Sequence, residues 1–161
     1  MPTPFIARTP EELPDRDALL SISGLEFMQD MLAGRKSMPP VAGVMNYVIH
    51  AVEPGRVAFR GAPEFRHTNP VGGVHGGWYG SLLDSALGCA AMTIVPKGHW
   101  YTTLEYKVNI TRALPIGTPI EVVGVVQHAG RSTVVATAEL RCLDHDKLYA
   151  TGSTTCIILP G

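Results

Sequence analysis

Residues 76–92 read GGWYGSLLDSALGCAAM, and this run of small and apolar residues decides the fold. Its length, its Leu and Ala content and a terminator at residues 96–98 predict a helix over residues 78–95. Apolar residues occupy nearly all sides of that helix, which is typical of a helix buried at the centre of a domain. Asp84 is the only charged residue in the run.

Asp84 is the first candidate for chemistry. A lone carboxylate on a buried helix must be paired, hydrogen-bonded or partly protonated, because burying an isolated charge is costly. Gly80 and Gly88 lie four residues to either side of it and form one stripe with it. Each glycine costs about 1 kcal/mol of helix stability relative to Ala. The stripe therefore indicates close approach by a ligand or a backbone, although tight packing with a locally hydrogen-bonded Asp84 would also explain it.

The rest of the chain predicts an antiparallel sheet. Runs of strand-forming residues, rich in Val, Ile and Thr, cover residues 44–52, 56–61, 100–111, 119–128, 131–143 and 147–159. The short turns between most of them favour antiparallel neighbours over parallel crossovers. We predict an α+β fold in which an antiparallel sheet of five to six strands is wrapped around one long central helix.

The N-terminal part predicts a helical extension of this domain. Residues 17–32 place apolar side chains near helical spacing, interrupted by Gly24. Pro39 and Pro40 prevent this helix from continuing. We therefore divide the chain into an N-terminal extension with a short helix, residues 1–40, and a single domain, residues 41–161.

Composition narrows the classes of partner. A net charge of −1 and a pI near 6.6 leave no electrostatic footprint for nucleic acid or an anionic membrane, so we expect neither. The three cysteines are widely spaced in apolar surroundings, which favours reduced, buried thiols over disulfides or a CxxC-type metal site. No basic segment followed by an apolar run opens the chain, so we expect a cytoplasmic protein.

A glycine-rich loop precedes the central helix and ends in His75, Gly76 and Gly77. Unpaired backbone N–H groups at a helix start can point at a ligand oxygen, assisted by the helix dipole. Such donors can polarise a carbonyl group or hold an oxyanion. His67, His75 and Asp84 are possible zinc-ligand types, but their spacing matches no standard pattern, so we expect no metal.

The loop, the helix and the following strand together resemble a known family. The residues that carry the resemblance are His67, Asn69, His75, Gly76, Gly77, Leu82, Asp84, Ala86, Gly88, Ala90, the segment 101–110 and Pro115. They resemble the acyl-coenzyme A thioesterases of the phenylacetate-degradation (PaaI) type, from about residue 24 to the C-terminus. The resemblance implies a hotdog fold, in which an antiparallel sheet surrounds a long helix.

The resemblance also implies catalytic roles. Asp84 would act as general base for a water molecule or as nucleophile on the thioester carbonyl. The amide of Gly76 or Gly77 would polarise the thioester oxygen, and His75 would support the loop or the carbonyl. Asn69 would orient the attacking water or the carboxylate.

Further residues are expected to contact the substrate. Thr102 and Thr103 lie where the family often places a third polar group. Trp78 is a candidate for the acyl pocket, with core packing as its alternative role. Arg131 is a candidate for the coenzyme A phosphates because guanidinium groups bind phosphate, as are Arg112 and Lys97.

The family builds its site across a homodimer interface, and dimers often pair into homotetramers. Nine residues of helix separate Asp84 from His75 by more than about 10 Å, and a two-fold axis would bring them together.

We predict an acyl-CoA thioesterase that converts a small or medium acyl or aryl thioester to the free acid and CoA. Coenzyme A enters as part of the substrate, and no cofactor is expected. The alternative is a non-catalytic acyl-CoA binding or sensing module.

Overall fold

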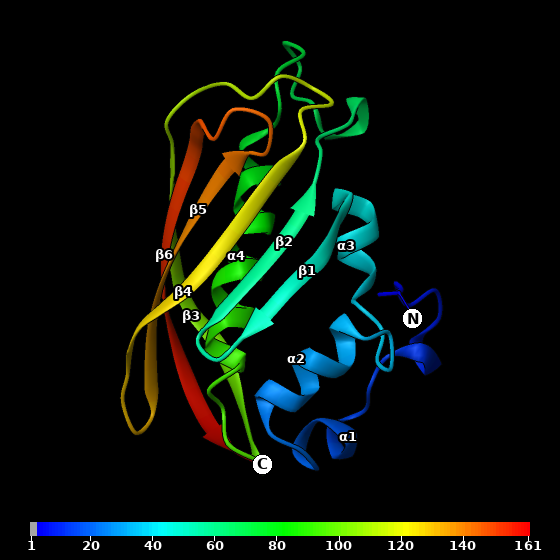
Figure 1. Ribbon diagram of the computed structural model, residues 1–161, viewed down its shortest axis with the longest axis vertical. Coiled ribbons are helices and arrows are strands. Elements are labelled where there is room, and N and C mark those ends of the chain that lie inside the picture. The colour runs from blue at the N-terminus through cyan, green and yellow to red at the C-terminus, as the bar shows by residue number, and fades with distance from the viewer. Residues whose placement is uncertain (1–2) are drawn as a thin grey trace.

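The computed structural model describes residues 3–161 and shows a curled sheet around one long helix (Figure 1). The helical elements are η1 (Pro10–Glu12), α1 (Arg16–Leu20), α2 (Gly24–Leu32), α3 (Pro40–Met45), η2 (Phe65–His67) and α4 (Gly76–Met92). The strands are β1 (Tyr47–Glu53), β2 (Arg56–Gly61), β3 (His99–Ile110), β4 (Ile120–Ala129), β5 (Thr133–Cys142) and β6 (Leu148–Pro160).

The six strands form one antiparallel sheet in the order β1-β2-β4-β5-β6-β3. The strand that follows α4 therefore pairs with the last strand of the chain and forms one edge of the sheet, while β1 forms the other. This arrangement confirms the predicted α+β architecture. It also places β3, which runs beside α4, at an open edge.

Helix α4 lies against the concave face of the sheet, and most of its side chains are buried. The contact with β4 depends on Gly124, because a Cβ atom there would collide with the backbone oxygen of Ala86. A glycine in mid-strand weakens a sheet unless another backbone approaches closely. Gly124 thus sets how near α4 can lie to the sheet.

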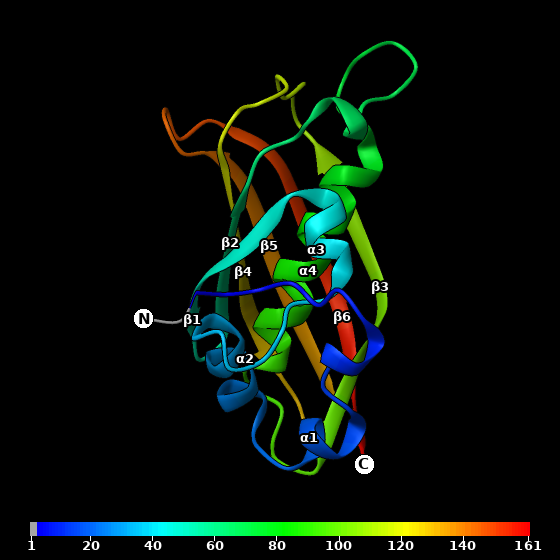
Figure 2. The same cartoon turned by 90° about the vertical axis from the view of Figure 1, so that its right-hand side faces the viewer.

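The N-terminal helices cover the opening between β1 and β3 (Figure 2). Helix α2 begins with a capping box between Ser23 and Glu26. Its first residue, Gly24, donates its N–H to the Val95 carbonyl at 2.9 Å. A Cβ atom at Gly24 would collide with the carbonyl oxygen of Met92. Helix α2 is therefore docked tightly on the C-terminal end of α4.

The central helix was predicted over residues 78–95, but α4 begins two residues earlier and ends at Met92. The predicted start of the first strand is also wrong. Residues 44 and 45 were expected in the first strand, but they complete α3, and β1 begins at Tyr47. The reason is that Pro40 occupies the first turn of α3, a position that suits proline, so the Pro-Pro pair starts a helix as well as preventing one. Asn46 then ends α3 in a left-handed conformation with φ of 55°.

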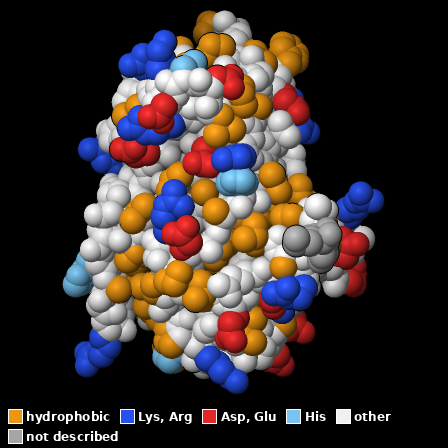
Figure 3. Space-filling model, in the orientation of Figure 1, with side chains coloured by type: hydrophobic (Ala, Val, Ile, Leu, Met, Phe, Trp, Pro, Cys, Tyr) orange, Lys and Arg blue, Asp and Glu red, His pale blue; other side chains and the backbone are white. Residues whose placement is uncertain are grey.

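The cysteines are free within residues 3–161: Cys142 and Cys156 are buried, and Cys89 is half-buried. Among the helices described, none combines the length and apolar character needed to cross a membrane. One of the ion pairs joins Arg60 to Glu121 at 2.9 Å. On the face shown in Figure 3, charged side chains of both signs lie interspersed. That face carries no extended patch of one sign.

Candidate active site

Asp84 lies half-buried in the middle of α4, on the side that faces β3. Its Oδ1 atom accepts a hydrogen bond from Thr103 Oγ1 at 3.4 Å. No basic side chain within residues 3–161 forms an ion pair with it. Burial raises the pKa of the Asp84 carboxyl group, and the hydrogen bond from Thr103 partly offsets this rise by lowering it. A carboxyl group with a raised pKa and no cationic partner is suited to accept a proton.

Two tyrosines of β3 pack beside the glycines that flank Asp84. A Cβ atom at Gly88 would lie 2.7 Å from Tyr101 Oη, and one at Gly80 would lie 3.4 Å from Tyr106 Oη. Close packing thus explains Gly88, as the alternative interpretation of the stripe proposed, whereas a Cβ atom at Gly80 would make only an ordinary van der Waals contact. Asp84 sits between the two contacts.

Polar groups that stay uncharged at neutral pH surround the Asp84 side of α4. Burial raises the pKa of the Tyr47 hydroxyl and of the Cys89 thiol to about 12 in each case, and the charge of Asp84 adds to both. Cys89 is therefore a thiol and not a thiolate nucleophile. Tyr47 Oη and Ser85 Oγ share a hydrogen bond of 2.7 Å. Among these groups only Asp84 can accept a proton readily.

The start of α4 presents one free amide. His75 is the N-cap residue, and its Nδ1 atom accepts a hydrogen bond from the Gly77 N–H at 2.9 Å. In the neutral ring the proton is therefore on Nε2. The N–H of Gly76 meets no acceptor in the part of the chain that the structure describes. Of the two amides predicted as oxyanion donors, Gly76 is thus the available one, and it is exposed.

The loop before α4 is ordered by Asn69. Its Oδ1 atom accepts hydrogen bonds from the N–H groups of Val71 at 3.1 Å and Gly73 at 3.0 Å. Its Nδ2 group has no acceptor within residues 3–161 and remains free to donate to a ligand. Asn69 therefore combines two structural hydrogen bonds within the loop with one available donor group.

His67 and Trp78 hold this loop to the core. His67 is buried. Its Nδ1 atom accepts a hydrogen bond from the Glu64 N–H at 2.9 Å, and its Nε2–H donates one to the Val44 carbonyl at 2.7 Å. Both ring nitrogens are thus engaged, and His67 shapes the loop. Trp78 is 2% exposed and donates its Nε1–H to the Met45 carbonyl at 2.9 Å. Its indole also borders a hollow of about 420 Å³ beside His75.

The two threonines of β3 differ in direction. Thr103 faces Asp84, whereas Thr102 is exposed on the opposite side of the strand. Arg131 belongs to the exposed connection between β4 and β5. That connection lies at the end of the molecule opposite to the start of α4 (Figure 1).

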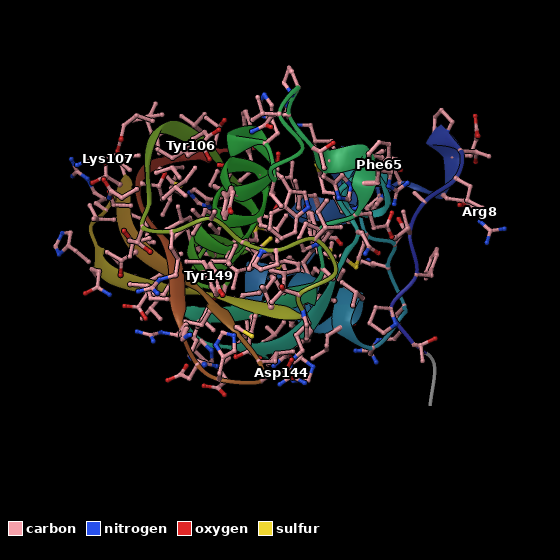
Figure 4. The ribbon with its side chains drawn as sticks, turned by 90° about the horizontal axis from the view of Figure 1, so that it is seen from above. Arg8, Phe65, Tyr106, Lys107, Asp144 and Tyr149 are labelled. Carbon is pink, nitrogen blue, oxygen red and sulfur yellow. The ribbon has the colours of Figure 1, made fainter. Side chains whose placement is uncertain are left out.

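The chain does not bring all the predicted groups together. Asp84 follows Gly76 by eight residues of helix, which corresponds to about 12 Å of rise. Figure 4, viewed from the end where α4 begins, shows Tyr106 on one side of α4 and Phe65 on the other. These apolar side chains are 47% and 81% exposed. The carboxylate and the free amide are thus separate in one chain.

Comparison with known proteins gives consistent matches. The model of the Thioesterase superfamily matches residues 71–149, which contain Gly76, Asp84 and Thr103. A solved structure of a conserved protein from Pseudomonas aeruginosa is 30% identical, with a TM-score of 0.70 over 76% of this chain and 95% of its own. The chain belongs to the thioesterase superfamily. It is a thioester hydrolase with the predicted hotdog fold.

Two further solved structures resemble this thioesterase. A thioesterase family protein from Silicibacter pomeroyi is 29% identical, with a TM-score of 0.70 over 76% of this chain and 90% of its own. A phenylacetic acid degradation-related protein from Ralstonia eutropha JMP134 is 28% identical, with a TM-score of 0.74 over 81% of this chain and 98% of its own. These matches confirm the PaaI-type resemblance. No curated protein matches the chain.

Tyr101 and Tyr47 of this thioesterase were not predicted as site residues. Both lie in strands beside Asp84, and burial raises the pKa of each hydroxyl further above its ordinary value. The glycine at position 88 was the available signal for Tyr101, because a missing Cβ atom indicates that a bulky neighbour fills the space. Tyr47 left no comparable mark in the sequence.

Proposed function

We propose that the chain hydrolyses acyl-coenzyme A thioesters with a small or medium acyl or aryl group, and that Asp84 activates the attacking water. The observation that carries the proposal is the half-buried carboxyl group of Asp84, which has a raised pKa, a hydrogen bond from Thr103 and no cationic partner among the described residues. A protein that only binds acyl-CoA gains nothing from a costly buried charge. Hydrolysis gives that charge a use.

The proposed site is shared by two chains. Strand β3 forms an open edge and exposes Leu104 (58%), Tyr106 (47%) and Ile110 (48%). An unprotected apolar edge strand favours pairing with another strand. A two-fold axis beside β3 would set Asp84 of one chain against Gly76 of its partner, which overcomes their separation within one chain. Such dimers would pair further into tetramers.

The proposed reaction proceeds through a tetrahedral intermediate. The Gly76 N–H at the positive end of α4 donates to the thioester oxygen, and Asn69 Nδ2 donates to the water or to that oxygen. Asp84 removes a proton from water while the water oxygen forms a bond to the carbonyl carbon. The intermediate then breaks its C–S bond, and the proton on Asp84 passes to the departing thiolate of CoA. His75 holds the loop in place throughout.

The remaining predicted residues serve binding. The edge of Trp78, with Gly77 and His75, lines the hollow that would receive the thiol end of CoA. Thr102 on the outer side of β3 and Arg131 in the β4–β5 connection would contact the partner-bound substrate, with Arg131 pairing with CoA phosphate. No resident cofactor takes part in the proposed reaction.

Thiol release tests this function. The substrates are short aliphatic, long aliphatic and aromatic acyl-CoA esters, and the variants are Asp84→Asn and Asp84→Ala. The exposed Asp144→Asn serves as a matched control. We expect loss of about 10²–10⁴-fold in kcat for the Asp84 variants, the usual contribution of a general base, and none for the control. Wild-type turnover in Asp84→Ala for every ester cleaved would exclude the proposed role.

Two outcomes separate related mechanisms. Solvent-oxygen labelling in a single turnover would place label in the Asp84 carboxylate only if that group attacks the thioester directly. Tight binding of acyl-CoA without turnover of any ester would instead indicate the binding or sensing module.

A further inference from the structure

An apolar chamber of about 200 Å³ lies between the N-terminal helices and α4. Its far wall includes Phe27, Met28 and Met31, which share one face of α2. Its near wall includes Ser85 and Cys89 of α4. We infer that this chamber holds the acyl tail of the substrate and that the face of α2 sets the length of tail accepted. This inference rests on the proposed thioester hydrolysis.

The polar atoms of the chamber gather at the end beside Asp84. Ser85 follows Asp84 in α4, and Tyr47 Oη meets Ser85 Oγ at 2.7 Å. Tyr101, which also lines the chamber, packs on Gly88 one turn after Asp84. A thioester carbonyl held at Asp84 therefore has the chamber directly beside it. The tail would extend away from the carboxylate towards α2.

The lining selects an uncharged tail. No Asp, Glu, Lys or Arg side chain from residues 3–161 lines the chamber, and its walls are methionine, aromatic and aliphatic groups. Burying a carboxylate or ammonium group there would cost several kcal/mol without a partner. Methionine side chains adapt to ligands of different shape. The chamber thus fits plain aliphatic or aryl tails and excludes ω-carboxyl or amino acyl groups.

The volume limits the tail to medium size. An apolar cavity of about 150 Å³ holds one benzene molecule. The chamber of about 200 Å³ thus has room for one aromatic ring with a short linker, or for an aliphatic tail of similar bulk. It is smaller than the pockets of about 300–1,000 Å³ that enclose drug-sized ligands. Long-chain acyl groups would meet the face of α2.

Helix α2 is a fixed wall and not a lid. The Gly24 N–H donates a hydrogen bond to the Val95 carbonyl at 2.9 Å. The carbonyl oxygen of Met92 leaves no space for a Cβ atom at Gly24. Lys36 Nζ lies 5.6 Å from the centre of the Phe27 ring, which braces the outer side of this wall. The depth of the chamber is therefore set by the side chains of α2. The acyl tail and Asp84 would lie in one chain, and the oxyanion donor would come from the partner chain.

Opposite substitutions at Met31 test the assignment. Met31→Ala enlarges the chamber, and Met31→Phe adds bulk to the same wall; Met28→Ala repeats the enlargement in case the first variant folds poorly. Leu32→Ala is the control, because Leu32 belongs to α2 and packs on the core without lining the chamber. We would measure kcat/KM for straight-chain acyl-CoA esters from butanoyl to tetradecanoyl and for phenylacetyl-CoA.

We expect the alanine variants to shift the preferred chain two to three carbons longer and Met31→Phe to shift it shorter. The ratio of kcat/KM between esters one methylene apart should change by about tenfold or more at the limit of the chamber. Unchanged profiles in the Met31 and Met28 variants, or an equal shift in Leu32→Ala, would overturn the assignment while leaving the hydrolysis intact.

A second readout is independent of turnover. Binding of 1-hexanol, 1-octanol, 1-decanol and 2-phenylethanol would be followed as the rise in Tm, since a ligand of the folded state stabilises it. We expect the alcohol giving the largest rise to be longer in Met31→Ala than in wild type. If the wild type cleaves no thioester, the proposed function fails, and the alcohol series alone then tests whether the chamber binds apolar tails. The same preferred alcohol in Met31→Ala and in wild type would overturn that assignment as well.

Discussion

Two opposing effects set the protonation state of Asp84. Burial raises the pKa of its carboxyl group, and the hydrogen bond from Thr103 lowers it. Only the ionised form can take a proton from water. Activity should therefore rise with pH through the Asp84 pKa, and Thr103 should determine where that rise occurs.

Removal of the Thr103 hydroxyl should move the acid limb of the pH profile. In Thr103→Val the hydrogen bond that lowers the Asp84 pKa is lost, so the pKa rises further and the acid limb of kcat/KM shifts to higher pH. The control is Thr137→Val, which changes an exposed threonine of β5 and should leave the profile in place. A limb that stays put or moves to lower pH in Thr103→Val would contradict the assignment.

Asp84 should also cost the protein stability at neutral pH. A carboxyl group whose pKa is higher in the folded state holds its proton more tightly there, so its ionisation above the ordinary value of 3.8 disfavours folding. Asp84→Asn should thus raise Tm at pH 7, and the gain should vanish near pH 3, where the carboxyl group is neutral in both states. Thermal unfolding at the two pH values measures this. A lower Tm at pH 7 for Asp84→Asn would show that the charge stabilises the fold.

The free amide of Gly76 can be removed with little change to the helix. Gly76 is the first residue of α4, where proline fits, and the preceding His75 has φ −65° and ψ 139°, which proline tolerates in its neighbour. Gly76→Pro deletes the N–H group, whereas Gly76→Ala keeps it and adds a methyl group with an ordinary contact to Ile110. We expect kcat to fall about 10²–10³-fold in the proline variant and to stay within a few-fold in the alanine variant. Equal activities would exclude Gly76 as the oxyanion donor.

At the scale of elements, α4 is held against the sheet by close backbone contact. Gly124→Ala places a Cβ atom against the Ala86 backbone oxygen, so α4 or β4 must shift. We expect a loss of about 1–3 kcal/mol in the free energy of unfolding, the usual cost of overpacking. Gly43→Ala in α3 meets only the flexible end of Ile6 and gains helix propensity, so it should not destabilise. Urea denaturation distinguishes them, and equal stabilities would disprove the role of Gly124.

The sequence predicted those elements whose residues carry a strong local signal. The apolar run around Asp84 indicates a central helix because a fully apolar circumference only suits burial. Helix α3 was missed because Pro39 and Pro40 signal both an end and a beginning. The sheet order, with β3 at the edge, depends on contacts between distant segments, which no local pattern contains.

The candidate site was only partly predictable for the same reason. The motif indicated Asp84 and a helix-start amide, but choosing Gly76 over Gly77 required knowing that the His75 ring occupies the Gly77 N–H. Choosing Thr103 over Thr102 required knowing which side of β3 faces α4. The acyl chamber was not predicted, because it forms where the N-terminal helices meet α4.

At the scale of the whole molecule, the separation of Asp84 from Gly76 is the central feature. About 12 Å of helix rise lies between them in one chain, and the open edge of β3 offers the surface across which a second chain could supply the missing half. We therefore propose that the carboxylate and the amide of each working site come from different subunits.

Complementation between two inactive chains tests this claim most directly. Differently tagged Asp84→Asn and Gly76→Pro chains would be co-expressed, and the mixed dimer would be isolated through both tags. A shared site predicts one intact centre, with Asp84 from one chain and Gly76 from the other, and therefore about half of the wild-type kcat per dimer. A mixed dimer no more active than its two parents would show that Asp84 and Gly76 do not act across the interface.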